Sequence, residues 1–309
     1  MKRRKRVRLA FRNQSRPGSC RANRCFERGP ARKLVVVCFL VVVLSATLAC
    51  DFFGLSEPEI GGPDPEPGDL LVLFIGSSYF ESNDMPGIFE RLATSAGRRV
   101  YVRRNVLSGN YLDFFAQSGW TEQAIEEQDW DYVVLQGGCQ NAAYPETHNE
   151  ITPNSGYHPV FPALQTLKEK VQANHAATRL VYMMPWAFED GMTWVQGMTD
   201  TYTDMQQKIH DNVLDWADSL EIQVAPVGWA WREVLSEVEQ VHYLHASDWN
   251  HPSWRGSYLG AAVIYGTLFT ESAEGLTYYG ALEEDEAQWF LEVASRVVMD
   301  SLRLWNLIP

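Results

Sequence analysis

The sequence has few cysteines, and nearly all of them lie near its amino end. Of the five, Cys20, Cys25, Cys38 and Cys50 fall within the first fifty residues, which leaves only Cys139 in the rest of the chain. A single cysteine cannot form a disulfide there, so a disulfide-stabilised fold is excluded. Cys139 also has no histidine or acid beside it in sequence, which favours a small buried hydrophobic residue over a nucleophile.

The sequence also lacks an apolar run of comfortable membrane-spanning length. Its longest uncharged apolar stretch, 34–49, has sixteen residues, whereas a transmembrane helix needs about 20. Residues 1–33 before it carry thirteen Lys or Arg and a single acid, Glu27. A basic leader followed by a short apolar segment predicts an export signal.

The apolar stretch ends at Thr47-Leu48-Ala49-Cys50, which resembles the lipobox of bacterial lipoproteins. The resemblance implies that Cys50 is lipidated and becomes the new amino terminus. Lipoboxes usually have Leu where this chain has Thr47, so an uncleaved signal anchor and a conventionally cleaved signal remain alternatives. All three alternatives predict an exported chain. A lipoprotein or an uncleaved signal anchor would also attach the chain to the membrane through residues 1–50, with its domain in the periplasm or at the cell surface.

Positive charge is scarce beyond this leader. Thirteen of the 26 basic residues but only one of the 39 acids lie in residues 1–50, so the rest of the chain carries a net charge near −25. Such a surface repels nucleic acid and anionic lipid, and we expect no nucleic-acid partner. The acidity is equally consistent with a role in solubility alone.

The remaining chain divides into a tether and one domain. Residues 51–68 form the predicted tether, because their last fourteen contain four prolines and three glycines and almost nothing to pack. Residues 69–309 form the predicted domain. Within it, apolar runs predict strands at 69–76, 99–105, 131–136, 179–184 and 222–227.

Amphipathic stretches predict helices between and after these strands, at 84–97, 110–127, 160–175, 197–220, 229–238, 254–270 and 284–306. Alternating strands and helices predict an α/β fold, a three-layer, flavodoxin-like open parallel sheet of about five strands with helices on both faces. An active site is then expected outside the carboxyl ends of the strands. The long connection 137–159 is expected to be a functional or mobile loop.

Polar residues follow the ends of the predicted strands. Ser78 follows the first strand, Gly109 the second, and the pair Gln140 and Asn141 the third, while Asp248 and His251 stand three residues apart after the fifth strand and its helix. A serine can attack a carbonyl, a histidine can accept its proton, and a nearby aspartate can orient the histidine. The backbone N–H of Gly109 and an amide side chain can stabilise the developing oxyanion.

This set, in this order, resembles the SGNH hydrolases, also called GDSL-type esterases. The resemblance covers about residues 69–272, and its last block, Asp248-Trp-Asn-His251 followed by Pro-Ser-x-x-Gly-x-Tyr-Leu-x-Ala, is the most specific. It implies that Ser78 is the nucleophile, that His251 and Asp248 are the base and its partner, and that Gly109 is an oxyanion donor. The other matching blocks are Gly76-Ser77-Ser78 and Asp131 to Asn141.

Two positions depart from the family pattern. Ser77 replaces the Asp or Asn before the nucleophile, and Gln140 occupies the position of the family's asparagine. The extra methylene of Gln140 moves its amide by about a bond length, so Asn141 is an alternative donor. The identity of the third oxyanion donor is therefore open.

Together these features predict a serine-dependent ester hydrolase that needs no cofactor or metal. Its substrate would be a small-molecule or polysaccharide ester, including acetylated carbohydrate, on which tryptophans such as Trp186, Trp194, Trp231 and Trp249 could stack. One alternative is a non-catalytic, glycan-binding surface lipoprotein with a degenerate fold. Another is a metal site, because His242, His245, Asp248 and His251 stand at three-residue steps.

Overall fold

The computed structural model describes residues 64–144, 158–194 and 199–308, which belong to one compact unit, Gly62–Pro309. The predicted leader, the lipidation of Cys50, most of the tether and most of the 137–159 connection lie outside the described residues.

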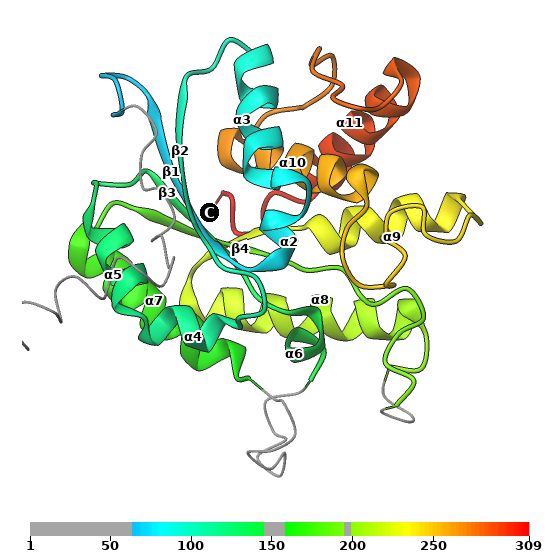
Figure 1. Ribbon diagram of the computed structural model, residues 1–309, viewed down its shortest axis with the longest axis horizontal. Helices are drawn as coiled ribbons and strands as arrows, with labels where there is room; N and C mark the ends of the chain where they lie inside the picture. The colour runs from blue at the N-terminus through cyan, green and yellow to red at the C-terminus, as the bar shows by residue number, and fades with distance from the viewer. Residues whose placement is uncertain (1–63, 145–157, 195–198, 309) are drawn as a thin grey trace, which may run out of the picture. The chain divides into compact units, whose positions relative to one another are not determined.

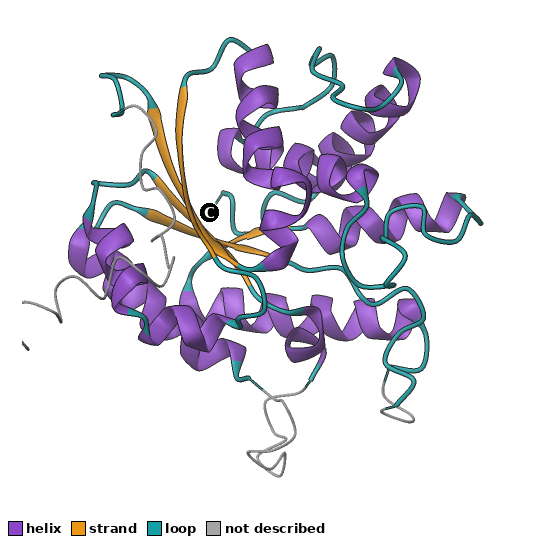
Figure 2. Ribbon diagram, viewed as in Figure 1, coloured by secondary structure: helices purple, strands orange, loops and turns teal. Residues whose placement is uncertain are grey.

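A five-stranded parallel sheet forms the centre of the domain (Figure 2). Its strands have the spatial order β2-β1-β3-β4-β5, and β1 pairs with both β2 and β3. This is the flavodoxin-like order, in which the crevice at the switch between β1 and β3 lies at the carboxyl ends of the strands. The strands are β1 (Leu70–Gly76), β2 (Val100–Val106), β3 (Tyr132–Gln136), β4 (Arg179–Met183) and β5 (Gln223–Ala225).

Helices cover both faces of the sheet (Figure 1). On one side lie α3 (Met85–Ser95), α9 (Val227–Glu237), α10 (Trp254–Phe269) and α11 (Glu284–Met299), with the short α2 (Ser78–Glu81) beside them. On the other side lie α4 (Leu112–Gln117), α5 (Gly119–Glu126), α6 (Cys139–Ala143), α7 (Val160–Asn174) and α8 (Tyr202–Leu220). A 3₁₀ turn, η2 (Ser82–Asp84), links α2 to α3.

The predicted α/β architecture is confirmed, with each predicted strand within a few residues of its observed bounds. The helices differ more. The predicted helix 110–127 divides into α4 and α5 at Ser118, whose extended backbone (φ −81°, ψ 127°) ends the first helix. The connection after β3 is not all loop, because α6 occupies its start, and α2 was not predicted. Both new helices are too short to show a helical period in sequence.

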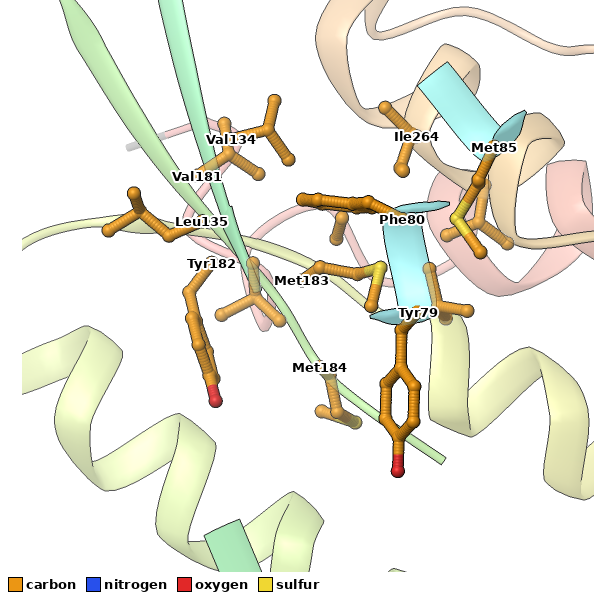
Figure 3. Packing of buried hydrophobic residues seen from close by; sticks show 14 of the residues in the cluster. Tyr79, Phe80, Met85, Val134, Leu135, Val181, Tyr182, Met183, Met184 and Ile264 are labelled. Carbon is orange, nitrogen blue, oxygen red and sulfur yellow. The ribbon is translucent and has the colours of Figure 1, made fainter. Parts of the chain in front are cut away.

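The core fills the space between the sheet and its helices. Phe80 on α2 packs edge-on against Phe74 of β1, with ring centroids 5.2 Å apart, and Figure 3 shows it directed toward the sheet near Met183. Nearly every side chain of α10 is buried. Among the described residues, no helix is both long and apolar enough to cross a membrane.

Candidate active site

The turn after β1 exposes Ser78 at the start of α2. A Cβ on Gly76 would lie 2.7 Å from Oε1 of Gln136, so only glycine allows this close approach. The Gln136 oxygen instead accepts a hydrogen bond from the backbone N–H of Ser77 at 2.7 Å. Ser78 is then the first residue of α2, where backbone N–H groups have no acceptor within the helix.

Three side chains from distant parts of the sequence form one hydrogen-bonded series. Nε2 of His251 lies 2.8 Å from Oγ of Ser78, and Nδ1 of His251 lies 2.5 Å from Oδ2 of Asp248. The predicted Ser78, His251 and Asp248 are therefore brought together. The side chain of His251 is 33% exposed, so a substrate can reach it from solvent.

The loop that carries Asp248 and His251 is closed by local bonds. Oδ1 of Asp248 accepts the backbone N–H groups of Asn250 and His251, at 3.1 and 2.9 Å. Burial alone would raise the pKa of Asp248, but the hydrogen bonds from the His251 ring and these two N–H groups outweigh it and lower the pKa. Asp248 is therefore ionised at neutral pH and can hold a proton on Nδ1 of His251.

Tyr79 and Trp186 hold the same loop through Asn250. Tyr79 was not predicted to contribute, and Trp186 was considered only as a stacking platform. The Tyr79 hydroxyl donates to Oδ1 of Asn250, and Nε1 of Trp186 donates to the backbone oxygen of Asn250 at 2.8 Å. The two rings stack at 4.5 Å, and the Tyr79 ring meets His251 edge-on at 5.8 Å. Burial raises the pKa of Tyr79 well above its usual value, so the hydroxyl keeps its proton and remains a donor. The sequence signal was adjacency, because Tyr79 follows Ser78 and Asn250 precedes His251.

A cavity of about 430 Å³ opens in front of Ser78 and His251. Gly109 lines it from the loop after β2, in a left-handed conformation (φ 77°) that favours glycine. Gln140 lines it from α6, and its Nε2 donates to the hydroxyl of Tyr111 at 3.0 Å. The predicted Gly109 and Gln140 thus share the cavity with Ser78.

Asn141 lies elsewhere. Its side chain is buried, and its Oδ1 accepts the backbone N–H of His158 at 3.3 Å, outside the cavity lining. Of the two amides left open by the sequence, only Gln140 faces the cavity. Cys139 is also fully buried, as expected for a small hydrophobic residue, and burial raises its pKa to about 12.

Of the four residues of the alternative metal site, Asp248 and His251 contact each other, whereas His242 and His245 have other partners. Nδ1 of His242 lies 2.6 Å from Oε2 of Glu189, and Nε2 of His245 lies 2.9 Å from the backbone oxygen of Ala187. Within the described ranges, no group of three or more His, Cys, Asp or Glu could hold a metal ion. The regular spacing in sequence does not bring all four side chains together, because the segment is a folded loop rather than a helix.

The tryptophans considered as stacking platforms divide into two groups. Trp186 and Trp231 are fully buried and stack on each other at 4.1 Å, so they belong to the core. Trp194 and Trp249 are exposed, at 65% and 54%. Trp249 stands between Asp248 and Asn250 in the sequence, but it does not line the cavity, and its ring lies 6.2 Å from that of His242.

A scan against protein-family models finds no matching model, and a search of the curated proteins finds no matching relative. Among solved structures, the chain is similar to a DUF4886 family protein from Bacteroides uniformis, with 14% identity and a TM-score of 0.59 over 76% of this chain and 95% of that one. This likeness shows a shared fold.

Two further structures are similar at lower scores. A protein from Slackia heliotrinireducens, proposed to be an SGNH hydrolase, has 22% identity and a TM-score of 0.49 over 64% of this chain and 97% of that one. An acetylxylan esterase from Geobacillus stearothermophilus has 19% identity and a TM-score of 0.44 over 65% of this chain and 93% of that one.

Proposed function

We propose that this chain is a serine-dependent ester hydrolase. The observation that carries the proposal is the unbroken series from Asp248 through His251 to Oγ of Ser78, which ends at a cavity lined by Gly109 and Gln140. A nucleophile, a base, the group that orients the base, and donors for an oxyanion are the parts that acyl transfer requires.

In the first step Oγ of Ser78 attacks the ester carbonyl while Nε2 of His251 takes its proton. The ionised Asp248 stabilises the imidazolium that forms. The backbone N–H groups of Ser78 and Gly109, with the side-chain amide of Gln140, stabilise the negative oxygen. His251 then returns the proton to the departing alcohol, and an acyl-serine remains.

In the second step water completes the turnover. His251 removes a proton from a water molecule, which attacks the acyl-serine carbonyl, and the same donors stabilise the second oxyanion. Collapse of this intermediate breaks the bond to Oγ of Ser78, and His251 protonates that oxygen as the acid leaves. None of these steps needs a cofactor or a metal ion.

The substrate class follows from the open, mixed character of the cavity. Serine, asparagine and glutamine side chains line it together with the rings of Tyr79 and Tyr111, so it suits a small ester with polar groups or an ester on a polysaccharide. If residues 1–50 export and anchor the chain as predicted, such an ester would be met outside the cytoplasm.

The test is hydrolysis of p-nitrophenyl acetate by the purified chain and its Ser78→Ala variant. We expect the substitution to lower kcat by about 10⁴-fold or more, because it removes the nucleophile. Ser236→Ala, which changes an exposed serine on α9, is the matched control and should retain the parent rate. Equal rates in the parent and Ser78→Ala proteins would contradict the proposal.

The alternative function is a non-catalytic glycan-binding protein. Two observations favour it, namely Gln140 at the family's asparagine position and the exposed side chain of Trp249, which precedes the cavity-lining Asn250 in the sequence. It predicts that the parent chain fails to hydrolyse the ester yet binds an oligosaccharide in calorimetry, with affinity lost in Trp249→Ala. Ester turnover that depends on Ser78 would exclude it.

A further inference from the structure

The amide of Gln140 is fixed by a side chain that neither the sequence nor the proposed reaction assigns a role. We propose that Tyr111 is a positioning residue that holds Gln140 as the third oxyanion donor, supported by His158 and Asp113. This inference rests on the proposed function, since it concerns how the same site stabilises its transition state.

Gln140 needs such support because of its length. A glutamine has one more rotatable bond than asparagine, so its amide loses more side-chain entropy when it is held in one place. An oxyanion donor acts well only if it is already in place when charge develops. An amide that is free to rotate in an open cavity would spend part of its time directed to solvent.

Tyr111 provides the support through one hydrogen bond. Its hydroxyl accepts Nε2–H of Gln140 at 3.0 Å, and both residues line the cavity that contains Ser78 and Gly109. A side-chain amide has two N–H groups. The hydroxyl of Tyr111 uses one of them, and the other remains available to an oxyanion.

Tyr111 is itself held by contacts on its other side. Its ring stacks on that of His158 at 3.8 Å with an interplanar angle of 14°. Nδ1 of His158 lies 2.9 Å from Oδ2 of Asp113, on the first turn of α4, and the backbone N–H of His158 donates to Oδ1 of Asn141. The contacts therefore join the loop after β2 to α6, the two elements that carry Gly109 and Gln140. Asn141 contributes to this support instead of acting as a donor.

A double-mutant cycle on hydrolysis of p-nitrophenyl acetate tests the inference. The proteins are the parent chain, Gln140→Ala, Tyr111→Phe and the double variant. We expect Gln140→Ala to lower kcat by about 10²- to 10³-fold, as for loss of an oxyanion donor. Tyr111→Phe keeps the stacked ring, and we expect it to lower kcat by about tenfold with KM unchanged, because the lost interaction acts in the transition state.

The double variant decides the question. If Tyr111 acts through Gln140, removal of its hydroxyl has no further effect once the amide is gone, and the double variant matches Gln140→Ala. If Tyr111→Phe lowers kcat equally in both backgrounds, the residue acts independently and the inference is wrong. Tyr101→Phe, on β2 away from the cavity, is the matched control and should retain the parent kcat.

A second measurement does not depend on turnover. In the Ser78→Ala protein, ¹⁵N relaxation of the Gln140 side-chain amide should show an ordered group, and the added Tyr111→Phe substitution should make it mobile. Unchanged order would overturn the inference even if the enzyme is active. If the parent chain shows no Ser78-dependent turnover but the amide order depends on Tyr111, the proposed function fails while the positioning contact stands.

Discussion

The two sides of the cavity are held in different ways. On the side of the proposed base, called here the base side, His251 lies in a loop that is fixed by several hydrogen bonds, from Asp248, Tyr79 and Trp186. On the side of the proposed oxyanion donor Gln140, called here the oxyanion side, the amide has one strong hydrogen bond, to the hydroxyl of Tyr111. The base side is therefore redundant, whereas the amide of Gln140 is held by one strong hydrogen bond and a weak 3.9 Å contact from the thiol of Cys139.

This difference follows from how each side is encoded. The base and its partner are three residues apart, so one short loop places both of them and its own backbone N–H groups complete the bonds to Asp248. The three proposed oxyanion donors follow three different strands, β1, β2 and β3, and contacts between these segments must fix the donors relative to each other. Substitutions that remove one hydrogen bond on each side test whether the loss lowers kcat less on the base side than on the oxyanion side.

The largest expected effect comes from Asp248→Asn, because the other hydrogen bonds to the loop cannot replace the negative charge of the Asp248 carboxylate. The amide oxygen can still accept the backbone N–H groups, so the loop should keep its shape. The amide nitrogen cannot accept the Nδ1 proton, which favours the wrong tautomer of His251, and kcat should fall by about 10⁴-fold. Hydrolysis of p-nitrophenyl acetate measures this, with Asp285→Asn on α11 as the control. A loss below tenfold would show that His251 does not need the carboxylate.

A smaller effect is expected for Tyr79→Phe, and this prediction tests the comparison most directly. The substitution removes the bond to Asn250 but leaves the bonds from Trp186 and Asp248 to the same loop. We expect kcat to fall by about threefold, less than the tenfold expected for Tyr111→Phe on the other side. The two variants differ from the parent by one hydroxyl each, so each is the matched control of the other. If Tyr79→Phe is the more damaging, the base side is not redundant.

The same contrast explains what the sequence could predict. Apolar runs and the helices between them predict the open parallel sheet, and the short spacing of Asp248 and His251 predicts their contact. The choice between Gln140 and Asn141 could not be made, because it depends on α6, which is only five residues long. Successive residues of a helix point about 100° apart, so once α6 forms, one amide faces the cavity and the other does not.

Tyr79 and Trp186 were missed for a related reason. Aromatic residues in apolar segments are usually core, and both are indeed buried. Their polar atoms reach Asn250 only because the loop before α10 folds back over the ends of β1 and β4. That approach is a tertiary contact between segments far apart in the chain, so adjacency to Ser78 and His251 could mark Tyr79 and Asn250 but could not predict their contact.

The smallest expected effect concerns the pH dependence of folding stability, through a buried histidine next to the base side. His245 is fully buried just before the Asp248 loop and pairs with Pro252 in a β-bridge. Burial lowers its pKa below the ordinary 6.5, although the carbonyl of Ala187 and the charge of Glu189 oppose this. The unfolded chain therefore binds a proton more readily than the folded one. Stability from this group is present above about pH 6.5 and is lost as the pH falls below it.

His245→Gln keeps a donor that can reach the oxygen of Ala187 but removes the titration. We expect the free energy of unfolding in urea to fall less between pH 8 and pH 5 in this variant than in the parent chain. The difference is bounded by about 1.4 kcal/mol per pH unit for one proton. Ser236→Ala on α9, which changes no titratable group, is the control and should retain the parent pH dependence. If His245→Gln also retains the parent pH dependence, protonation of the buried imidazole does not destabilise the fold, and the base side keeps its stability at low pH.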